Sequence, residues 1–86
     1  MGYEVIWQEK VLHDLKMIDE KNAARILERV GTYLAQNPAG LGTPLKGIFK
    51  GLFRYRYGNY RIIYTMDVAE KKIIVLHVKH RKEAYR

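Results

Sequence analysis

Residues 45–64 read LKGIFKGLFRYRYGNYRIIY, and this stretch predicts a β-hairpin of alternating cationic and aromatic side chains. The turn is Gly58-Asn59. A two-residue loop with Gly at its first central position favours a type II′ turn, whose twist matches that of the flanking strands. Such a turn sets the register of both strands. We therefore expect Tyr57 opposite Tyr60, Arg56 opposite Arg61, Tyr55 opposite Ile62, and Arg54 opposite Ile63.

Alternation gives the predicted hairpin one cationic and one apolar face. Arg54, Arg56 and Arg61 share the cationic face. The apolar face carries Phe53, Tyr55, Ile62 and Tyr64. Two arginines directly opposite each other on paired strands repel and destabilise the hairpin. We expect a protein that tolerates this cost to hold an anion there, and the spacing of the cations suggests a polyanion such as a phosphodiester backbone.

Length and composition predict a single folded domain over residues 1–86. A chain of 86 residues buries only about 60–65% of the surface that it exposes when unfolded. The absence of cysteine excludes disulfides and thiolate metal sites and fits a reducing cytoplasm. The chain does not begin with a basic segment and an apolar run, and no stretch approaches the ~20 apolar residues of a membrane span. We therefore expect a cytoplasmic protein with no membrane contact.

The charge balance is strongly basic. Sixteen Lys and Arg against nine Asp and Glu give a net charge of +7 and a pI near 9.8. This balance predicts attraction to nucleic acid or to an acidic protein partner. A merely soluble basic surface is the alternative.

The pattern along the chain predicts an α+β fold with the order βααβββ. Apolar residues recur at helical spacing in two segments that Asp19, a good N-cap, separates. These segments are expected to form a helical hairpin on one face of a mostly antiparallel four-stranded sheet. The expected elements are a strand at 3–7, helices at 11–18 and from 19 to about 37, a Gly/Pro loop at 39–44, the hairpin, and a last strand at 72–79.

The last strand reads as a central one. Residues 73–76 are continuously apolar, which is typical of a strand buried on both faces. His77 falls by alternation on the same face as Ile73 and Val75, so packing is its favoured role. No Gly-rich phosphate loop, paired-carboxylate motif or metal-ligand spacing is present, and we expect neither a metal nor another cofactor.

The segment after that strand carries a different kind of chemistry. Residues 79–86 read KHRKEAYR and place cations, an imidazole and a phenol on one short stretch. Taken alone, it is a solvated charged terminus. If the last strand lies next to residues 60–66, the segment ends beside the Arg56/Arg61 face and the functional interpretation is favoured.

Together these motifs resemble a known family. The runs Leu45-Lys46-Gly47, Arg54-Tyr55-Arg56, residues 60–64 (YRIIY) and His80-Arg81-Lys82, with Tyr85, are similar to those of the RelE branch of the RelE/ParE toxins. The resemblance covers nearly the whole chain and implies a toxin of a type II toxin–antitoxin system. It further implies cleavage of mRNA in the ribosomal A site, and silencing by a RelB-like antitoxin in a hetero-oligomer.

The resemblance also implies roles for particular residues. By position, the family's basic residues fall on Arg54, Arg56, Arg61 and Arg81, and its C-terminal tyrosine falls on Tyr85. Many relatives have lysine where Arg54 and Arg56 stand, and some have a longer turn. The neighbouring cations expected to bind RNA phosphates are Lys46, Lys50, Lys79 and Lys82.

Cleaving RNA requires a base, an acid and stabilisation of a pentacoordinate phosphorus. Guanidinium groups suit the last task. Tyr85 is the candidate base, because surrounding arginines would lower its pKa from about 10. The family precedent favours Arg81 as the acid, whereas the ordinary imidazole pKa of about 6.5 favours His80, and both remain open. Such imperfectly matched groups would need the ribosome to orient the substrate.

Two other functions compete with this interpretation. A ParE-like member of the superfamily would inhibit DNA gyrase and cut no RNA, but such chains generally lack the clustered cations with a terminal tyrosine. A small non-catalytic RNA-binding module would need exposed aromatic residues on the cationic face for stacking with bases, and none is evident there.

Overall fold

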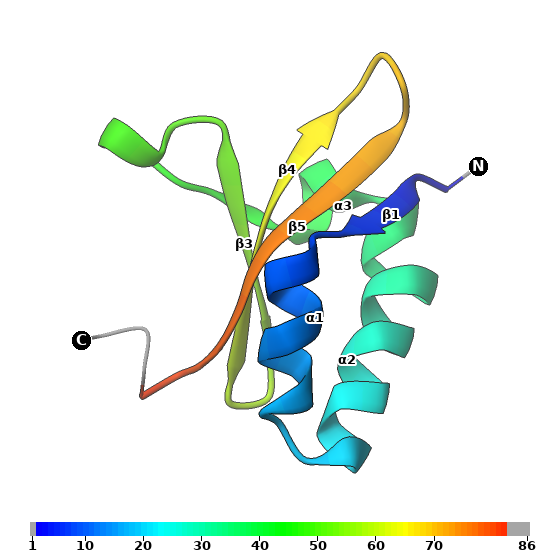
Figure 1. The fold of residues 1–86 in the computed structure, drawn as a ribbon. Coiled ribbons are helices and arrows are strands. Elements are labelled where there is room, and N and C mark those ends of the chain that lie inside the picture. The colour runs from blue at the N-terminus through cyan, green and yellow to red at the C-terminus, as the bar shows by residue number, and fades with distance from the viewer. Residues whose placement is uncertain (1, 83–86) are drawn as a thin grey trace.

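The computed structural model describes residues 2–82, and Figure 1 shows a twisted sheet with the long helices packed on one side. The elements are β1 (Glu4–Trp7), α1 (Glu9–Lys16), α2 (Glu20–Thr32), the 3-10 helix η1 (Leu34–Gln36), α3 (Pro38–Leu41), β2 (Thr43–Pro44), the 3-10 helix η2 (Gly47–Phe49), β3 (Leu52–Tyr57), β4 (Tyr60–Asp67) and β5 (Lys72–His80). The predicted α+β class and the order of the main elements are confirmed.

Within residues 2–82 the sheet has five strands in the order β1-β5-β4-β3-β2, rather than the predicted four. The additional strand is β2, in which Thr43 and Pro44 pair with Arg54 and Phe53 of β3. A two-residue strand shows no alternation of its own, and Pro44 is tolerated because an edge strand does not need its missing N–H. β1 is parallel to β5 and the other neighbours are antiparallel, so the sheet is mostly antiparallel, as predicted.

The β3–β4 hairpin confirms the predicted register. Its partners are Tyr57 and Tyr60, Arg56 and Arg61, Tyr55 and Ile62, and Arg54 and Ile63. Gly58 has a φ of 58°, whereas Asn59 is not among the described residues with positive φ. Positive φ at the first central position alone fits the predicted type II′ turn and excludes type I′.

The helical segment is more finely divided than its pattern predicts. Asp19 caps α2 by accepting a hydrogen bond from the backbone N–H of Asn22 at 3.1 Å, as expected of an N-cap aspartate. α2 ends at Thr32, short of the predicted end near Asn37. The Asn37 side chain instead caps α3, so the predicted loop at 39–44 contains a helical turn and a short strand.

A bulge in β5 changes which side chains face the helices. Ile63 of β4 pairs with His77, but the next residue, Tyr64, pairs with Val75, so Leu76 has no counterpart. The extra residue reverses the alternation of faces beyond it. His77 therefore lies beside Ile63 on the sheet face away from α1 and α2, which we call the open face. The prediction that His77 shares the face of Val75 is wrong.

β5 is central in the sheet, yet only one of its faces is covered by helices. Ile73 and Val75 are 0% exposed, whereas Ile74 and Leu76 remain partly exposed. The prediction that residues 73–76 are buried on both faces is therefore wrong. The reason is that α1 and α2 lie on the same side of the sheet (Figure 1).

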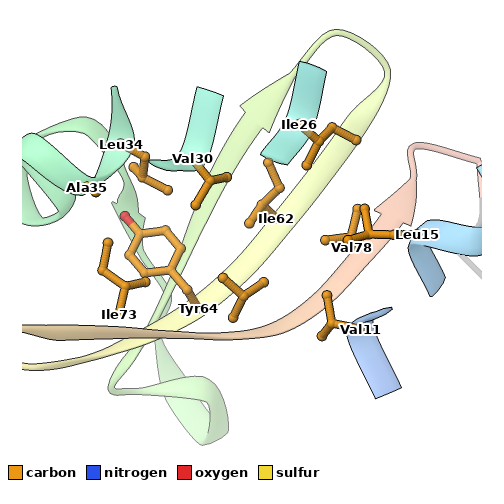
Figure 2. Close-up of a cluster of buried hydrophobic side chains, with 11 residues drawn as sticks. Val11, Leu15, Ile26, Val30, Leu34, Ala35, Ile62, Tyr64, Ile73 and Val78 are labelled. Carbon is orange, nitrogen blue, oxygen red and sulfur yellow. The ribbon is translucent and has the colours of Figure 1, made fainter. Parts of the chain in front are cut away.

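The hydrophobic core lies between those helices and the sheet (Figure 2). In the described part of the chain, its buried residues are Val11, Leu15, Ile26, Val30, Leu34, Ala35, Ile62, Tyr64, Ile73, Val75 and Val78. The buried Tyr64 hydroxyl donates a hydrogen bond to the carbonyl of Pro38 at 2.6 Å. A Cβ at Gly42 would collide with this hydroxyl. Burial, with a smaller contribution from Tyr55, raises the pKa of Tyr64 to about 12.

Candidate functional site

A small cationic hollow lies at the end of the β3–β4 hairpin. This hairpin hollow has a volume of 180 Å³ and is lined by Arg56, Gly58, Asn59, Tyr60, Arg61 and Arg81. The backbone N–H of Arg81 donates to the carbonyl of Asn59 at 2.6 Å. This bond fixes the start of the segment after β5 against the hairpin turn, so residues far apart in the sequence line one hollow.

A row of three cations crosses the open face next to this hollow. Arg56 pairs with Arg61, and Arg61 pairs on its other side with Lys79. Neighbouring strands lie about 4.8 Å apart, so the backbone positions of this cation row span about 10 Å. Like charges at directly opposite positions destabilise a sheet. A polyanion bound along the row would relieve the repulsion.

Asp14 of α1 provides a counter-ion at one end of the cation row. Its Oδ1 lies 3.8 Å from Lys79 Nζ, and the two side chains are 18% and 42% exposed respectively. Within residues 2–82, Asp14 Oδ2 is buried and has no hydrogen-bond partner. The packing of α1 beside β5 therefore brings a carboxylate to the edge of the cationic face.

The remaining predicted phosphate-binding residues are more dispersed. Arg54 lies on the same face as Arg56, two positions along β3, and is partly exposed. Lys46 and Lys50 are exposed and flank η2. Lys82 is also exposed, and its backbone N–H donates to His80 Nδ1 at 3.2 Å.

A second hollow on the open face is mostly apolar. It has a volume of 280 Å³ and is lined by Leu45, Phe49, Leu52, Arg61, Ile63, His77 and Lys79. Arg61 thus borders both hollows. The η2 side chains Ile48 and Phe49 are 93% and 53% exposed. Gly47 and Gly51 flank this turn, and both have positive φ. These two glycines indicate a turn in the sequence, whereas the alternation of residues in this stretch predicted a strand.

His77 contributes an imidazole to the wall of this apolar hollow. Burial lowers the pKa of His77 below 6.5, Lys10 and Lys79 lower it further, and Asp14 raises it. Within residues 2–82, the Nδ1 atom of His77 is buried and has no hydrogen-bond partner. The folded protein therefore favours a neutral ring next to the cation row.

Metal-binding clusters and membrane-spanning helices are both absent from residues 2–82. This part of the chain has no cluster of three or more His, Asp or Glu side chains that is arranged to hold a metal ion. It also has no helix with the length and apolar character needed to cross a membrane.

Comparison with known proteins identifies the family of this chain. Over residues 5–85, the chain matches the family described as the ParE toxin of type II toxin–antitoxin systems, parDE. It is similar to Toxin RelE of Mycobacterium tuberculosis (strain ATCC 25618 / H37Rv), with 34% identity over 84 residues, 98% of this chain and 87% of that protein. This chain is a RelE-type toxin of the RelE/ParE superfamily.

Solved structures share the fold of this RelE-type toxin. One is the toxin–antitoxin complex RelBE2 from Mycobacterium tuberculosis, with a TM-score of 0.90, 28% identity, and coverage of 94% of this chain and 100% of that chain. Another is the archaeal RelE–RelB complex from Pyrococcus horikoshii OT3, with a TM-score of 0.73, 28% identity, and coverage of 94% and 97%. The protein is thus a toxin of a type II toxin–antitoxin system.

The toxin brings most of the residues marked by the resemblance together. Arg56, Arg61 and Arg81 line the hairpin hollow, and Arg54 continues the same face. Tyr85 lies outside the described residues.

His80 is oriented differently from these arginines. Its ring packs edge-on against Tyr60, with ring centroids 5.3 Å apart. It lines a separate hollow between α1 and the end of β5, together with His13 and Asp19. A phosphate in the hairpin hollow would therefore meet Arg81 before it met His80.

Sequence reasoning missed several residues of the site. The sequence pattern marks Asn59 only as a turn residue, yet its carbonyl accepts the hydrogen bond that fixes the segment carrying Arg81. Nothing in the local sequence of Asp14 connects it with Lys79. Only the packing of α1 against β5 shows that pairing.

Proposed function

We propose that the toxin is a ribosome-dependent endoribonuclease that cleaves mRNA in the ribosomal A site. The observation that carries this proposal is the meeting of Arg56, Arg61 and Arg81 in one hollow. Guanidinium groups present rigid donor forks that bind phosphate oxygens in pairs. A cytoplasmic location belongs to the same proposal, because translating ribosomes are the proposed target.

The proposed reaction needs no metal ion. The 2′-hydroxyl loses its proton and its oxygen attacks the adjacent phosphorus, while the bond from phosphorus to the 5′-oxygen breaks. A 2′,3′-cyclic phosphate and a 5′-hydroxyl result. Arg56 and Arg61 stabilise the extra negative charge on phosphorus as it develops. Arg54, Lys46, Lys50, Lys79 and Lys82 bind the flanking phosphates.

Tyr85 is the proposed base, and Arg81 or His80 donates the proton that the 5′-oxygen takes up as it leaves. A phenol is a weak acid with a pKa of about 10, and arginines brought beside it would favour its phenolate. Arg81 lines the hairpin hollow but holds its own proton tightly. His80 has the better matched reference pKa, yet it would have to leave its contact with Tyr60 to reach the hollow.

These imperfect acid and base groups explain why the reaction should depend on the ribosome. The ribosome can lower the activation free energy of cleavage by orienting the reacting groups, even if the groups that transfer protons are poorly matched. We expect free RNA to be bound through the cation row but cleaved slowly.

Replacement of Tyr85 by Phe tests the proposal. General-base catalysis contributes ~10²–10⁴-fold, so Tyr85→Phe should slow single-turnover cleavage of mRNA on ribosomes by about that factor. Ribosome affinity should be kept, because the ring remains and only the hydroxyl is removed. Tyr3→Phe is the matched control. Cleavage by Tyr85→Phe at the parental rate would remove the phenol from the mechanism.

Parallel assays of His80→Ala and Arg81→Ala identify the group at the leaving oxygen. In a substrate with 5′-sulfur in place of the 5′-oxygen, the sulfur departs as a thiolate and does not need to be protonated. The variant that lacks the true acid should therefore lose much less activity on this substrate than on normal RNA. Equal losses on both substrates would assign both residues to phosphate binding.

A RelB-like antitoxin is the proposed partner, in a toxin–antitoxin hetero-oligomer. The solved complexes of similar toxins support it. The net charge of +7 would steer an acidic segment toward the cationic face. Association should slow as ionic strength rises, and the bound toxin should not cleave RNA. Association rates that do not change with salt would contradict this mode of recognition.

Inhibition of DNA gyrase is the second candidate function, because the matched family is that of ParE toxins. A supercoiling assay separates the two. Inhibition of gyrase without cleavage of ribosome-bound mRNA would replace the endoribonuclease proposal. RNA binding without either activity would leave a non-catalytic RNA-binding module.

A further inference from the structure

A fourth hollow lies on the helix side of the molecule, away from the open face. It has a volume of 300 Å³ and is formed by one face of α2 and the end of β3. Its lining residues are Arg25, Glu28, Arg29, Thr32 and Tyr57. We call it the α2 groove. None of these residues has a part in the chemistry proposed above.

Arg29 is held in the α2 groove by two aromatic rings. Its guanidinium carbon lies 4.6 Å from the ring centroid of Tyr33 and 5.5 Å from that of Tyr57. Contacts of this kind orient the guanidinium plane and leave its edge N–H groups available to a ligand. Arg29 is also exposed. The groove thus contains a positioned cation next to aromatic faces.

Arg25 adds a second cation one helical turn away. Residues four apart on a helix are neighbours, and like charges there destabilise the helix. Glu28 also lines the groove, but within residues 2–82 no ion pair joins it to either arginine. The α2 groove therefore resembles the cation row, because in both places neighbouring cations repel each other and a bound anion would reduce the repulsion.

The α2 groove and the hairpin hollow flank the same end of the hairpin. Arg56 lines the hairpin hollow, and Tyr57, the next residue, lines the α2 groove on the opposite face. β2 pairs with β3 only at Phe53 and Arg54. In the described part of the chain, no strand covers the remaining edge of β3. An extended polyanion can pass around this edge and contact both hollows.

The chemistry of the groove favours RNA over an acidic peptide. Tyr57 lines the groove and Tyr33, beside it, is 44% exposed. Aromatic rings and arginine guanidiniums both stack with bases. The Glu28 carboxylate would repel an acidic peptide but can accept a hydrogen bond from an exocyclic amino group of a base. The Thr32 hydroxyl donates to the carbonyl of Glu28 at 2.7 Å, and its oxygen remains an acceptor.

We propose that the α2 groove is a second RNA-binding site, at which Arg25 and Arg29 hold phosphates and Tyr57 stacks with a base. The inference rests on the proposed function only for the choice of RNA as the polyanion. The RNA segment is either mRNA that flanks the cleaved phosphate or ribosomal RNA beside it. Its role is to position the substrate, so removing the site should affect affinity and not the chemical step.

The test compares the double variant Arg25→Ala/Arg29→Ala with the charge-matched control Lys16→Ala/Lys21→Ala. Affinity is measured by fluorescence anisotropy for single-stranded RNAs of increasing length, and separately for vacant ribosomes without mRNA. The arginine variant should lose about tenfold or more in one of these affinities. The slope of log affinity against log salt should fall by about 1.4 if both arginines bind a phosphate of a single strand. The cleavage rate at saturating ribosomes should equal the parental rate.

The two binding measurements identify the source of the RNA. A loss only with long oligonucleotides assigns the groove to flanking mRNA, and a loss with vacant ribosomes assigns it to ribosomal RNA. Arg29→Lys keeps the charge but removes the planar guanidinium, so it should lose part of the affinity while it folds as the parent does. Arg29→Lys replaces the double alanine variant in the binding measurements if the latter is unstable.

Two results would overturn the inference. One is RNA and ribosome affinity equal to that of the lysine control. The other is a loss confined to binding of an acidic antitoxin segment, which would make the groove a protein-binding surface. Neither depends on catalysis. If the parental toxin cleaves no RNA but the arginine variant still binds RNA more weakly, the proposed function fails and the second site stands.

Discussion

Lys79 Nζ lies 3.8 Å from Asp14 Oδ1, so the last cation of the row across the open face already has its own counter-ion. A partly exposed pair of this kind contributes only about 0–1 kcal/mol to stability. The ion pair therefore contributes little to stability, and its main effect is to lower the positive electrostatic potential of the cationic face. An RNA phosphate that approaches Lys79 must compete with the carboxylate.

Asp14→Asn should strengthen RNA binding. Removal of the carboxylate charge frees Lys79 for a phosphate, so the slope of log affinity against log salt should steepen by roughly 0.7. Anisotropy with a labelled single-stranded RNA at several salt concentrations measures both quantities. Glu20→Gln on α2 is the control for removal of a carboxylate elsewhere. Weaker binding by Asp14→Asn would mean that Asp14 holds Lys79 in position for RNA.

Arg61→Ala should weaken RNA binding more than any other single change in the cation row. Arg61 pairs with both Arg56 and Lys79 and borders both hollows of the open face. The salt slope should fall by roughly 0.7 for each phosphate that the variant no longer binds, and Arg56→Ala should have a smaller effect. Thermal unfolding, recorded in parallel, should show that the domain still folds. Unchanged affinity and slope for Arg61→Ala would refute the anion-binding face.

Tyr64→Phe should destabilise the fold without affecting RNA binding. The change removes a buried hydrogen bond of 2.6 Å and leaves the Pro38 carbonyl with only the bond from the backbone N–H of Gly42 at 3.3 Å. The expected cost is about 0.5–1.5 kcal/mol, and each kcal/mol lowers the Tm of a domain of this size by about 4–8 °C. Differential scanning calorimetry measures the shift.

Gly42→Ala provides a second measurement at the same contact. Its Cβ would collide with the Tyr64 hydroxyl, so the single variant should be strongly destabilised. The double variant Gly42→Ala/Tyr64→Phe should be less destabilised than the sum of the single effects, because Phe removes the colliding oxygen. Simple additivity would contradict the proximity of the two groups.

His77 should make stability depend on pH below neutrality. Burial first, and then Lys10 and Lys79, lower the pKa of His77 from 6.5. The unfolded chain therefore takes up the proton at higher pH than the folded protein does. The free energy of unfolding should not depend on His77 above about pH 6.5. It should decrease as the pH falls from there toward the lowered pKa of His77 in the folded protein, and below that pKa His77 should cause no further decrease.

His77→Gln should flatten this part of the stability profile. Urea unfolding between about pH 7 and pH 5 measures the profile. His13→Gln, which replaces an exposed histidine of α1, is the control and should keep the parental slope. If His77→Gln kept that slope as well, another group would be responsible for the dependence on pH.

Local sequence accounts for the hairpin and for its cationic face. Gly58 permits the positive φ that the turn requires, and alternation from that point determines which side chains share a face. Asp19 likewise caps α2 through groups three residues apart. These features depend on neighbours along the chain, so they could be predicted from spacing alone.

Tertiary contacts decided what spacing could not show. The extra residue Leu76 in β5 is visible only from the pairing with β4, and it turned His77 to the open face. Lys79 meets Asp14 because α1 packs beside β5. Arg29 meets Tyr57 because α2 lies against the end of β3. Local spacing along the chain therefore predicts the type of elements and the chemistry of the hairpin face. Packing between distant segments determined which charges acquire partners, because periodicity carries no information about which helix lies beside which strand.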